Sequence, residues 1–216
     1  MIQNVRETGK RLKVRTADRL RVHFLALGRR ILSWQQSAGF RSDTGLSIGV
    51  TSSDKRAGRT VVAFNLAAAL ASLGNGPVLY VETQYSQTGF ARKVPRPGNG
   101  LSEVLKGSQP VSACICNTNV SNLFVMSCGR IREQDAAELP VEALDSINPE
   151  LGNTFDYIVY DLPVASDTDL CYPIAQRLDG VLIVNESNVN EARLQRILNR
   201  LRDLQTSVIG IVLNKT

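Results

Sequence analysis

A polar segment of ten residues, TSSDKRAGRT at positions 51–60, lies between two apolar stretches of very different character. Before it comes the short run 46–51, which has the composition of a strand buried on both faces of a parallel sheet. After it comes the alanine-rich run 60–73, which Gly74 ends as glycine commonly ends a helix. Strand, polar loop and helix in this order are what a phosphate-binding loop requires. The sequence therefore predicts such a unit at the start of the core.

The loop departs from the pattern G-x-x-x-x-G-K-[ST] most consequentially at its lysine. Ser53 lies at the first glycine, Gly58 at the second and Thr60 at the hydroxyl position, but Arg59 stands at the lysine. Arginine keeps the charge and pairs with phosphate, yet its planar head is bulkier than an ammonium group in a tight loop. We therefore expect an anion site with weakened chemistry. The predicted nucleotide-binding residues are Ser53, Asp54, Lys55, Arg56, Ala57, Gly58, Arg59, Thr60, Val61, Asn214 and Lys215.

The remaining sequence alternates apolar strands with helices and shows no internal repeat. Strands are predicted at 46–51, 77–82, 122–127, 156–161, 180–185 and 208–213, and helices at 16–32, 60–73, 101–106, 136–151 and 190–204. This alternation predicts an α/β fold with a mostly parallel central sheet and helices on both faces. Residues 1–44 are predicted to be a basic helical extension with a linker at 33–43, and residues 45–216 a single phosphate-loop domain.

Polar residues end several of the predicted strands, at the edge where parallel sheets bind ligands. Asp161 closes the strand YIVYD, where an acid would organise the water shell of Mg²⁺, although an aspartate that caps a turn would look the same. Glu82 ends the second predicted strand, VLYVE. Asn214 and Lys215 follow the last strand, and they either contact a nucleobase or are polar residues near a chain end.

The net charge of +5 is unevenly distributed along the chain. Residues 1–41 carry ten Lys and Arg against two acids. This basic segment is either a solvated or partner-docking helix face, a contact with an anionic membrane surface, or a nucleic-acid contact, and the first reading is favoured.

Several functional classes are excluded by composition. His23 is the only histidine, so neither a Ser-His-Asp hydrolase nor a zinc site with the four cysteines is expected. The cysteines are predicted to be free and mostly buried. Apolar runs are too short or too charged to span a bilayer, and the first residues lack a secretory signal pattern. A soluble, cytoplasmic protein is expected.

From residue 46 onward the sequence resembles the MinD/ParA-type P-loop ATPases, and especially their bacterial tyrosine autokinase (BY-kinase, CpsD/CapB-like) branch. The resemblance is carried by TSSDKRAGRTVVAFNLAAALASLG, PVLYVET, NGLSEVLKG, FDYIVYDLPVASDTD, LDGVLIVNES and VIGIVLNK. It implies a P-loop NTPase fold, ATP or ADP with Mg²⁺ as cofactor, and a metal site formed by Thr60, Glu82 and Asp161. It also implies Arg59, Glu82 and Asp161 as the residues at the catalytic positions.

The departures from the family pattern fall on these catalytic positions. The family has P-G-E-G-K-[ST] in the loop and D-x-D after the second strand, where this chain has Arg59, Glu82 and Gln84. An amide cannot ionise, so Gln84 cannot serve as the base that deprotonates a substrate tyrosine. The family's E-x-x-R-x-x-R assembly motif is not matched by Arg15, Asp18 and Arg21, and its C-terminal tyrosine cluster is not found before Thr216.

Three functional hypotheses follow. The first is a catalytically impaired partner or regulator of exopolysaccharide or capsule synthesis and export, which docks on the cytoplasmic face of a membrane polysaccharide co-polymerase or export complex. Homo-oligomers are a further possible assembly, and residues 1–41 would allow a peripheral contact with the inner membrane. Nucleic acid is the least expected partner. The second is an active ATP-dependent protein-tyrosine kinase or ATPase of the same process. The third is a ParA-like positioning ATPase.

Overall fold

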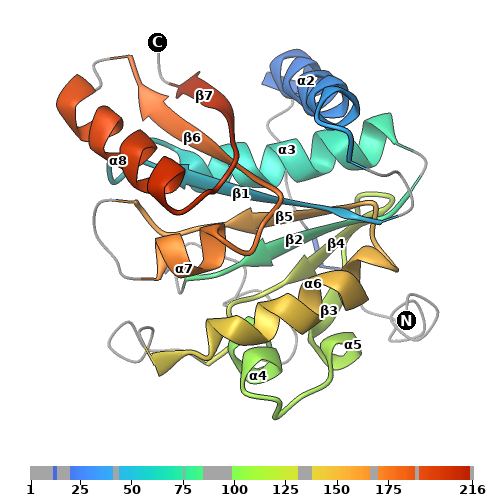
Figure 1. The fold of residues 1–216 in the computed structure, drawn as a ribbon. Coiled ribbons are helices and arrows are strands. Elements are labelled where there is room, and N and C mark those ends of the chain that lie inside the picture. The colour runs from blue at the N-terminus through green and yellow to red at the C-terminus, as the bar shows by residue number, and fades with distance from the viewer. Residues whose placement is uncertain are drawn as a thin grey trace.

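The computed structural model describes residues 12–13, 20–40, 44–74, 76–84, 99–130, 138–165, 170–187 and 190–214. A twisted seven-stranded sheet runs through the centre with helices packed on it (Figure 1). The strands are β1 (Leu46–Ser52), β2 (Val78–Glu82), β3 (Ile115–Asn117), β4 (Leu123–Met126), β5 (Tyr157–Asp161), β6 (Gly180–Glu186) and β7 (Val208–Asn214). The helices are α2 (Arg21–Ser37), α3 (Arg59–Leu73), α4 (Leu101–Leu105), α5 (Val111–Cys114), η4 (Val141–Ala143), α6 (Leu144–Gly152), α7 (Cys171–Ala175) and α8 (Glu191–Asp203).

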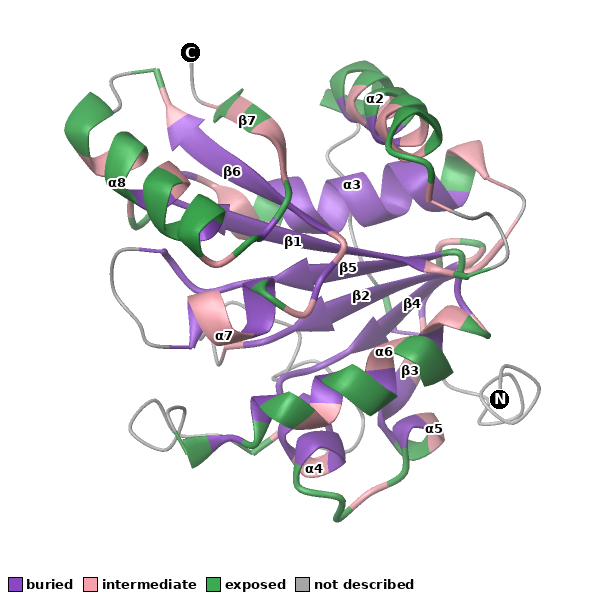
Figure 2. Ribbon diagram, in the orientation of Figure 1, coloured by how far each residue is buried: buried purple, intermediate pink, exposed green. Residues whose placement is uncertain are grey.

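The strand order is β3-β4-β2-β5-β1-β6-β7, and every pairing is parallel except that of the edge strand β3 with β4. The predicted α/β fold with a mostly parallel sheet is therefore confirmed. β1, β2, β4 and β5 are buried along their whole length, which explains why they read as continuous apolar runs instead of alternating patterns (Figure 2). The edge strand β7 is only partly covered.

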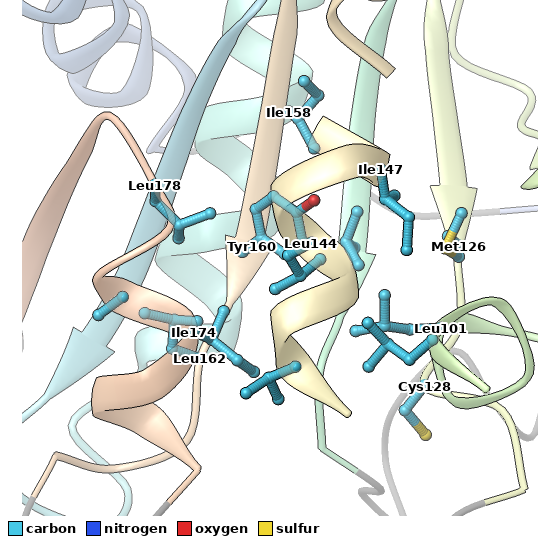
Figure 3. Packing of buried hydrophobic residues seen from close by; sticks show 14 of the residues in the cluster. Leu101, Met126, Cys128, Leu144, Ile147, Ile158, Tyr160, Leu162, Ile174 and Leu178 are labelled. Atoms are coloured by element: carbon cyan, nitrogen blue, oxygen red, sulfur yellow. The ribbon is translucent and has the colours of Figure 1, made fainter. Parts of the chain in front are cut away.

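Helices cover both faces of the sheet, as predicted. Helices α2 and α3 pack on one face, where the alanines of α3 allow it to lie almost completely buried. Helices α4 to α8 pack on the other face. Figure 3 shows part of this second core, in which Leu144 and Ile147 of α6 lie over Tyr160 of β5 and Met126 of β4. The sheet is thus held rigidly between two apolar layers, and its strand ends become fixed points.

Helix α2 extends further than the sequence predicted. The predicted linker at 33–43 is wrong over its first part, because the helix continues to Ser37. Trp34 packs against Phe40 with ring centroids 5.1 Å apart, and the Tyr157 hydroxyl donates to Gln35 at 2.8 Å. The polar composition of this segment hid the contacts that keep it helical. Residues 16–19 of the predicted helix lie outside the described residues.

The N-terminal segment also joins the core of the molecule. Gly28 of α2 lies against Leu70 and Leu73 of α3, where an added Cβ would lie 2.7 Å from the Leu73 Cδ1 atom. Leu12 is buried and pairs with Thr118 next to β3. The boundary between an extension at 1–44 and a domain at 45–216 stays a prediction. Most of the basic residues in the segment lie outside the described residues.

Short elements account for the remaining differences from the predicted pattern. The predicted helix at 136–151 begins later, as the 3₁₀ turn η4 after Pro140, and continues as α6 to Gly152. The three short elements α5, β3 and α7 were not predicted, because each is too short to show a period. Within the described residues, no helix has both the length and the apolar character needed to cross a bilayer.

Candidate functional site at the carboxyl ends of the strands

The order in which the chain visits the strands places the predicted loop at the switch point of the sheet. Helix α3 leads from β1 to β2 across one face, whereas α8 leads from β6 to β7 across the other. From β1 the next strands are added toward one edge of the sheet, and from β6 the next strand is added toward the other edge. The strand order therefore switches between the neighbouring strands β1 and β6, which is where open parallel sheets bind ligands. The polar segment 53–58 follows β1 at this point.

The loop reaches the start of α3 through two residues with left-handed backbone. Gly58 has φ +86° and precedes the first helical residue, and Arg56 has φ +68°, at the position where the family pattern has glycine. The Asn214 amide donates to the Ala57 carbonyl oxygen at 2.8 Å, so the end of β7 closes against the loop. A Cβ on Gly58 would clash with this amide and would displace Asn214, and the positive φ adds strain for any other residue.

The first half of the loop is tied to β6 and α8. The Ser53 hydroxyl donates to the Asn185 side-chain oxygen at 2.5 Å, and Asn185 is completely buried. Asp54 forms an ion pair with Arg193 of α8. The Asn190 side chain caps α8 by accepting from the Arg193 amide at 3.0 Å. The loop is therefore supported on several sides, while Lys55 is exposed.

Arg59 points away from the loop toward the tips of β5 and β2. Its Nε donates to the Asp161 Oδ1 at 3.2 Å, and its Nη2 lies 3.5 Å from the Gln84 Oε1. The remaining nitrogen, Nη1, is buried and has no hydrogen-bond partner among the described residues. The cation of the loop is thus paired with the acid that the sequence predicted for Mg²⁺.

Asp161 is the most heavily engaged residue of the site. Its Oδ2 accepts from the Tyr80 hydroxyl at 3.0 Å, and its backbone oxygen accepts from the Thr83 hydroxyl at 2.6 Å. Burial raises the pKa of the Asp161 carboxyl, and the charge of Arg59 and a hydrogen bond from Thr60 oppose that shift. The pKa of Tyr80 is raised well above its usual 10.0, mainly by burial and secondly by the negative charge of Asp161. The Tyr80 hydroxyl therefore stays protonated and remains a hydrogen-bond donor.

A second buried carboxylate lies beside this one. Glu82 is 1% exposed and is the register partner of Asp161 on the adjacent strand. Two carboxylates at the tips of neighbouring strands need positive charge close by, since burying unpaired charge is costly. The Arg59 guanidinium, which bonds Asp161, is a cation at these strand ends.

The structure thus brings most of the predicted residues to one edge of the sheet. Arg59, Thr60, Glu82 and Asp161 lie together at the tips of β2 and β5, and the rest of the loop lies at the tips of β1 and β6 with Asn214 beside it. Val61 is half exposed on the first turn of α3, and Lys215 lies outside the described residues. Whether these residues bind nucleotide stays a prediction.

Three residues of this network were not singled out from the sequence: Tyr80, Asn185 and Arg193. Asn185 carried a usable signal, since it is a polar residue near the end of an apolar strand, like Asp161. Tyr80 and Arg193 carried no sequence signal that would have identified them. The tyrosine sits inside a buried strand, and the arginine is one of several on a charged helix.

No protein-family model matches the chain. It is 29% identical over 170 residues to the tyrosine-protein kinase CpsD of Streptococcus pneumoniae serotype 4, covering 78% of this chain and 75% of the relative. It is 30% identical over 174 residues to the succinoglycan biosynthesis transport protein ExoP of Rhizobium meliloti, covering 78% of this chain but 22% of that much longer protein.

Solved structures share the fold. The kinase domain of the Escherichia coli tyrosine kinase ETK superposes with a TM-score of 0.76 at 18% identity, covering 89% of this chain and 75% of that one. The septum site-determining protein MinD of Pyrococcus horikoshii, solved with Mg-ADP, superposes with a TM-score of 0.64 at 19% identity, covering 78% of this chain and 70% of that one. The predicted resemblance to the BY-kinase branch of the MinD/ParA-type P-loop ATPases is therefore confirmed: the chain is similar in sequence to the tyrosine-protein kinase CpsD, and it shares the fold of BY-kinase domains and of MinD.

Proposed function

We propose that this protein binds a nucleotide at the loop after β1, turns ATP over weakly or not at all, and acts as a partner or regulator in exopolysaccharide or capsule synthesis and export. One observation carries the proposal. The loop cation Arg59 is bonded to Asp161, the acid expected to organise Mg²⁺, while Gln84 replaces the second acid of the family pattern.

The expected loss of activity follows from how phosphoryl transfer is catalysed. Nearly all of the rate comes from positioning the phosphates and stabilising charge on them. A guanidinium held at the strand tips is displaced from the place of a loop lysine, and the Gln84 amide cannot accept a proton as a base. Together these changes would lower turnover by several orders of magnitude while leaving the loop able to hold an anion.

The biological setting is supported by the names of the relatives. CpsD is a tyrosine-protein kinase and ExoP is a succinoglycan biosynthesis transport protein. A chain of this family that has lost turnover would act by docking. We propose that it does so in the cytoplasm, at the inner face of a membrane polysaccharide co-polymerase or export complex. The proposed contacts are the basic segment 1–41, which faces this partner or the membrane, and a homo-oligomeric interface.

The test compares the full chain with a variant in which both family residues are restored. Phosphate release from ATP is measured for the wild type, for the double variant Arg59→Lys/Gln84→Asp, and for Arg196→Lys as a control on the exposed face of α8. We expect the double variant to exceed the wild type by at least about 100-fold. We expect the control to match the wild type, and phosphotyrosine to be absent from wild-type protein by mass spectrometry.

Either of two results would refute the proposal. The first is robust phosphotyrosine on wild-type protein purified away from other kinases. The second is wild-type turnover equal to that of the double variant, when thermal shift shows that both are folded.

A second candidate function, an active ATP-dependent kinase or ATPase, is favoured by one observation. The loop cation and the Thr60 hydroxyl each bond Asp161, so much of a catalytic constellation is present. Under this alternative, wild-type protein turns over ATP and Asp161→Asn abolishes that turnover. Under our proposal there is little turnover to lose.

A further inference from the structure

Asp161 does not present the arrangement that a Mg²⁺ shell needs. In P-loop proteins the acid at this strand end holds the metal, and the metal bridges it to the phosphates. Here the Asp161 Oδ1 is 3.2 Å from the Arg59 Nε, and the Oδ2 is 3.0 Å from the Tyr80 hydroxyl. One oxygen is thus already neutralised by a fixed cation, and the other is occupied by a neutral donor.

The guanidinium has the properties needed to replace such a bridge. It is permanently charged, and its donors point in several directions in one plane, so it can bind a carboxylate on one side and a phosphate on another. Arg59 uses Nε toward Asp161 and directs Nη2 toward Gln84. Its Nη1 is buried and has no hydrogen-bond partner among the described residues. A buried donor without a partner is costly, so an anion that accepts from it gains affinity.

A second buried donor at the loop is also unsatisfied. Asn185 is completely buried, its oxygen accepts from Ser53 of the loop, and its Nδ2 has no hydrogen-bond partner within the described part of the chain. One of these two nitrogens belongs to Arg59, which follows the loop in sequence, and the other belongs to Asn185, which bonds Ser53 at the start of the loop. Both are donors, which suits an oxygen-rich anion such as a phosphate chain and does not suit a metal ion.

We infer that this site binds ADP or ATP without a divalent metal ion, with the Arg59 guanidinium taking the place of Mg²⁺ between Asp161 and the phosphates. The inference rests on the proposed function in that the loop binds nucleotide, but it does not depend on how fast that nucleotide is hydrolysed. It explains why an arginine stands at the lysine position of the loop: its guanidinium replaces the metal ion.

The test is calorimetric titration of the full chain with ADP, in Mg²⁺ and in EDTA. For the wild type we expect dissociation constants that agree within about twofold, because no metal takes part. For Arg59→Lys we expect binding to strengthen at least about tenfold when Mg²⁺ is added, because the shorter point charge leaves Asp161 open to the metal. Arg196→Lys, on the exposed face of α8, should behave as the wild type.

A direct metal readout accompanies the titration. With Mn²⁺ and ADP, electron paramagnetic resonance should show no protein-bound metal for the wild type and bound metal for Arg59→Lys. Should Arg59→Lys fail to fold, Asp161→Asn serves instead. Metal-free binding predicts that its ADP affinity in EDTA is kept or increased, whereas a metal-bridged site predicts that affinity in Mg²⁺ is lost.

The outcomes separate this inference from the proposed function. Wild-type affinity that rises tenfold or more with Mg²⁺, or bound Mn²⁺ in the wild type, overturns the inference and leaves impaired turnover standing. Metal-independent binding together with rapid ATP hydrolysis overturns impaired turnover and leaves the inference standing. No binding of ADP in either condition overturns both.

Discussion

The pair formed by Arg59 and Asp161 joins residues 102 positions apart and sets the chemistry of the site. Burial favours the neutral carboxyl, while the guanidinium favours the carboxylate. The net effect is a raised pKa, so the folded protein binds this proton more tightly than the unfolded chain does. Stability contributed by Asp161 is therefore greatest at low pH and decreases as the pH rises through the raised value.

Replacing Arg59 with methionine should steepen this pH dependence. The variant lacks the largest influence that lowers the Asp161 pKa, so the loss of stability above about pH 4 should extend to higher pH, by about 1.4 kcal/mol for each unit of further increase. Urea unfolding at a series of pH values measures it. In the double variant Arg59→Met/Asp161→Asn, the additional dependence of the free energy of unfolding on pH should disappear. A pH profile unchanged by Arg59→Met would show that the pair does not control this proton.

The four cysteines are free, and three of them are buried, as the sequence predicted. Burial is the main cause that raises the thiol pKa to about 11 for Cys114 and Cys171, and to about 12 for Cys128. Because the thiolate is the reactive form, these residues should resist iodoacetamide at neutral pH, and the partly exposed Cys116 should react first. Peptide mapping of native and urea-unfolded protein measures this. Equal labelling of Cys116 and Cys171 in native protein would contradict it.

At the scale of elements, α2 and the loop before α3 depend on close packing. Helix α2 lies across α3 through buried residues such as Ile31, and glycine at position 28 allows the approach. The loop depends on a left-handed glycine beside the last residue of β7. Each feature can be tested against a control in the same chain.

Ile31→Ala should lower the free energy of unfolding by about 2–5 kcal/mol, because it leaves a cavity between α2 and α3. Val22→Ala on the same helix removes a side chain that is 76% exposed, so its effect should stay within about 0.5 kcal/mol. Urea denaturation followed by circular dichroism measures both. Similar values for the two variants would mean that α2 is not part of the folded core.

Gly58→Ala should lower the free energy of unfolding by more than the backbone strain at this position alone explains. Both Gly58 and Gly39 have positive φ, but a Cβ on Gly58 would strike the Asn214 amide, whereas one on Gly39 meets nothing within 4 Å. Gly39→Ala should therefore cost about 1 kcal/mol of strain. Gly58→Ala should cost more and also weaken ADP binding at least about tenfold. Calorimetry and urea unfolding measure the two effects, and equal costs with unchanged affinity would contradict the loop geometry.

At the scale of the whole molecule, two apolar cores enclose one sheet, and the N-terminal helix belongs to one of them (Figures 1 and 2). Trp34 is the only tryptophan and lies on α2. Its fluorescence should therefore report the same urea transition as far-UV circular dichroism, because α2 and the sheet unfold together. A fluorescence transition at clearly lower urea would instead show that residues 1–44 form a separate extension.

The alternation of strands and helices was readable from the sequence, because buried parallel strands and an alanine-rich helix have local signatures. The loop could also be predicted from its local pattern, and so could the position of Asp161 at a strand end. The short elements and the later part of α2 could not, since a polar stretch stays helical only when distant side chains such as Tyr157 bind it.

By itself, the sequence determined the α/β fold and the position of an arginine where a lysine would be expected. Only the tertiary structure decided what that arginine contacts. Local periodicity is fixed by neighbouring residues, but the pairing of Arg59 with Asp161 depends on how β1, β5 and β2 lie side by side in the sheet. Strand order is a property of packing over the whole chain, so no local pattern reveals it.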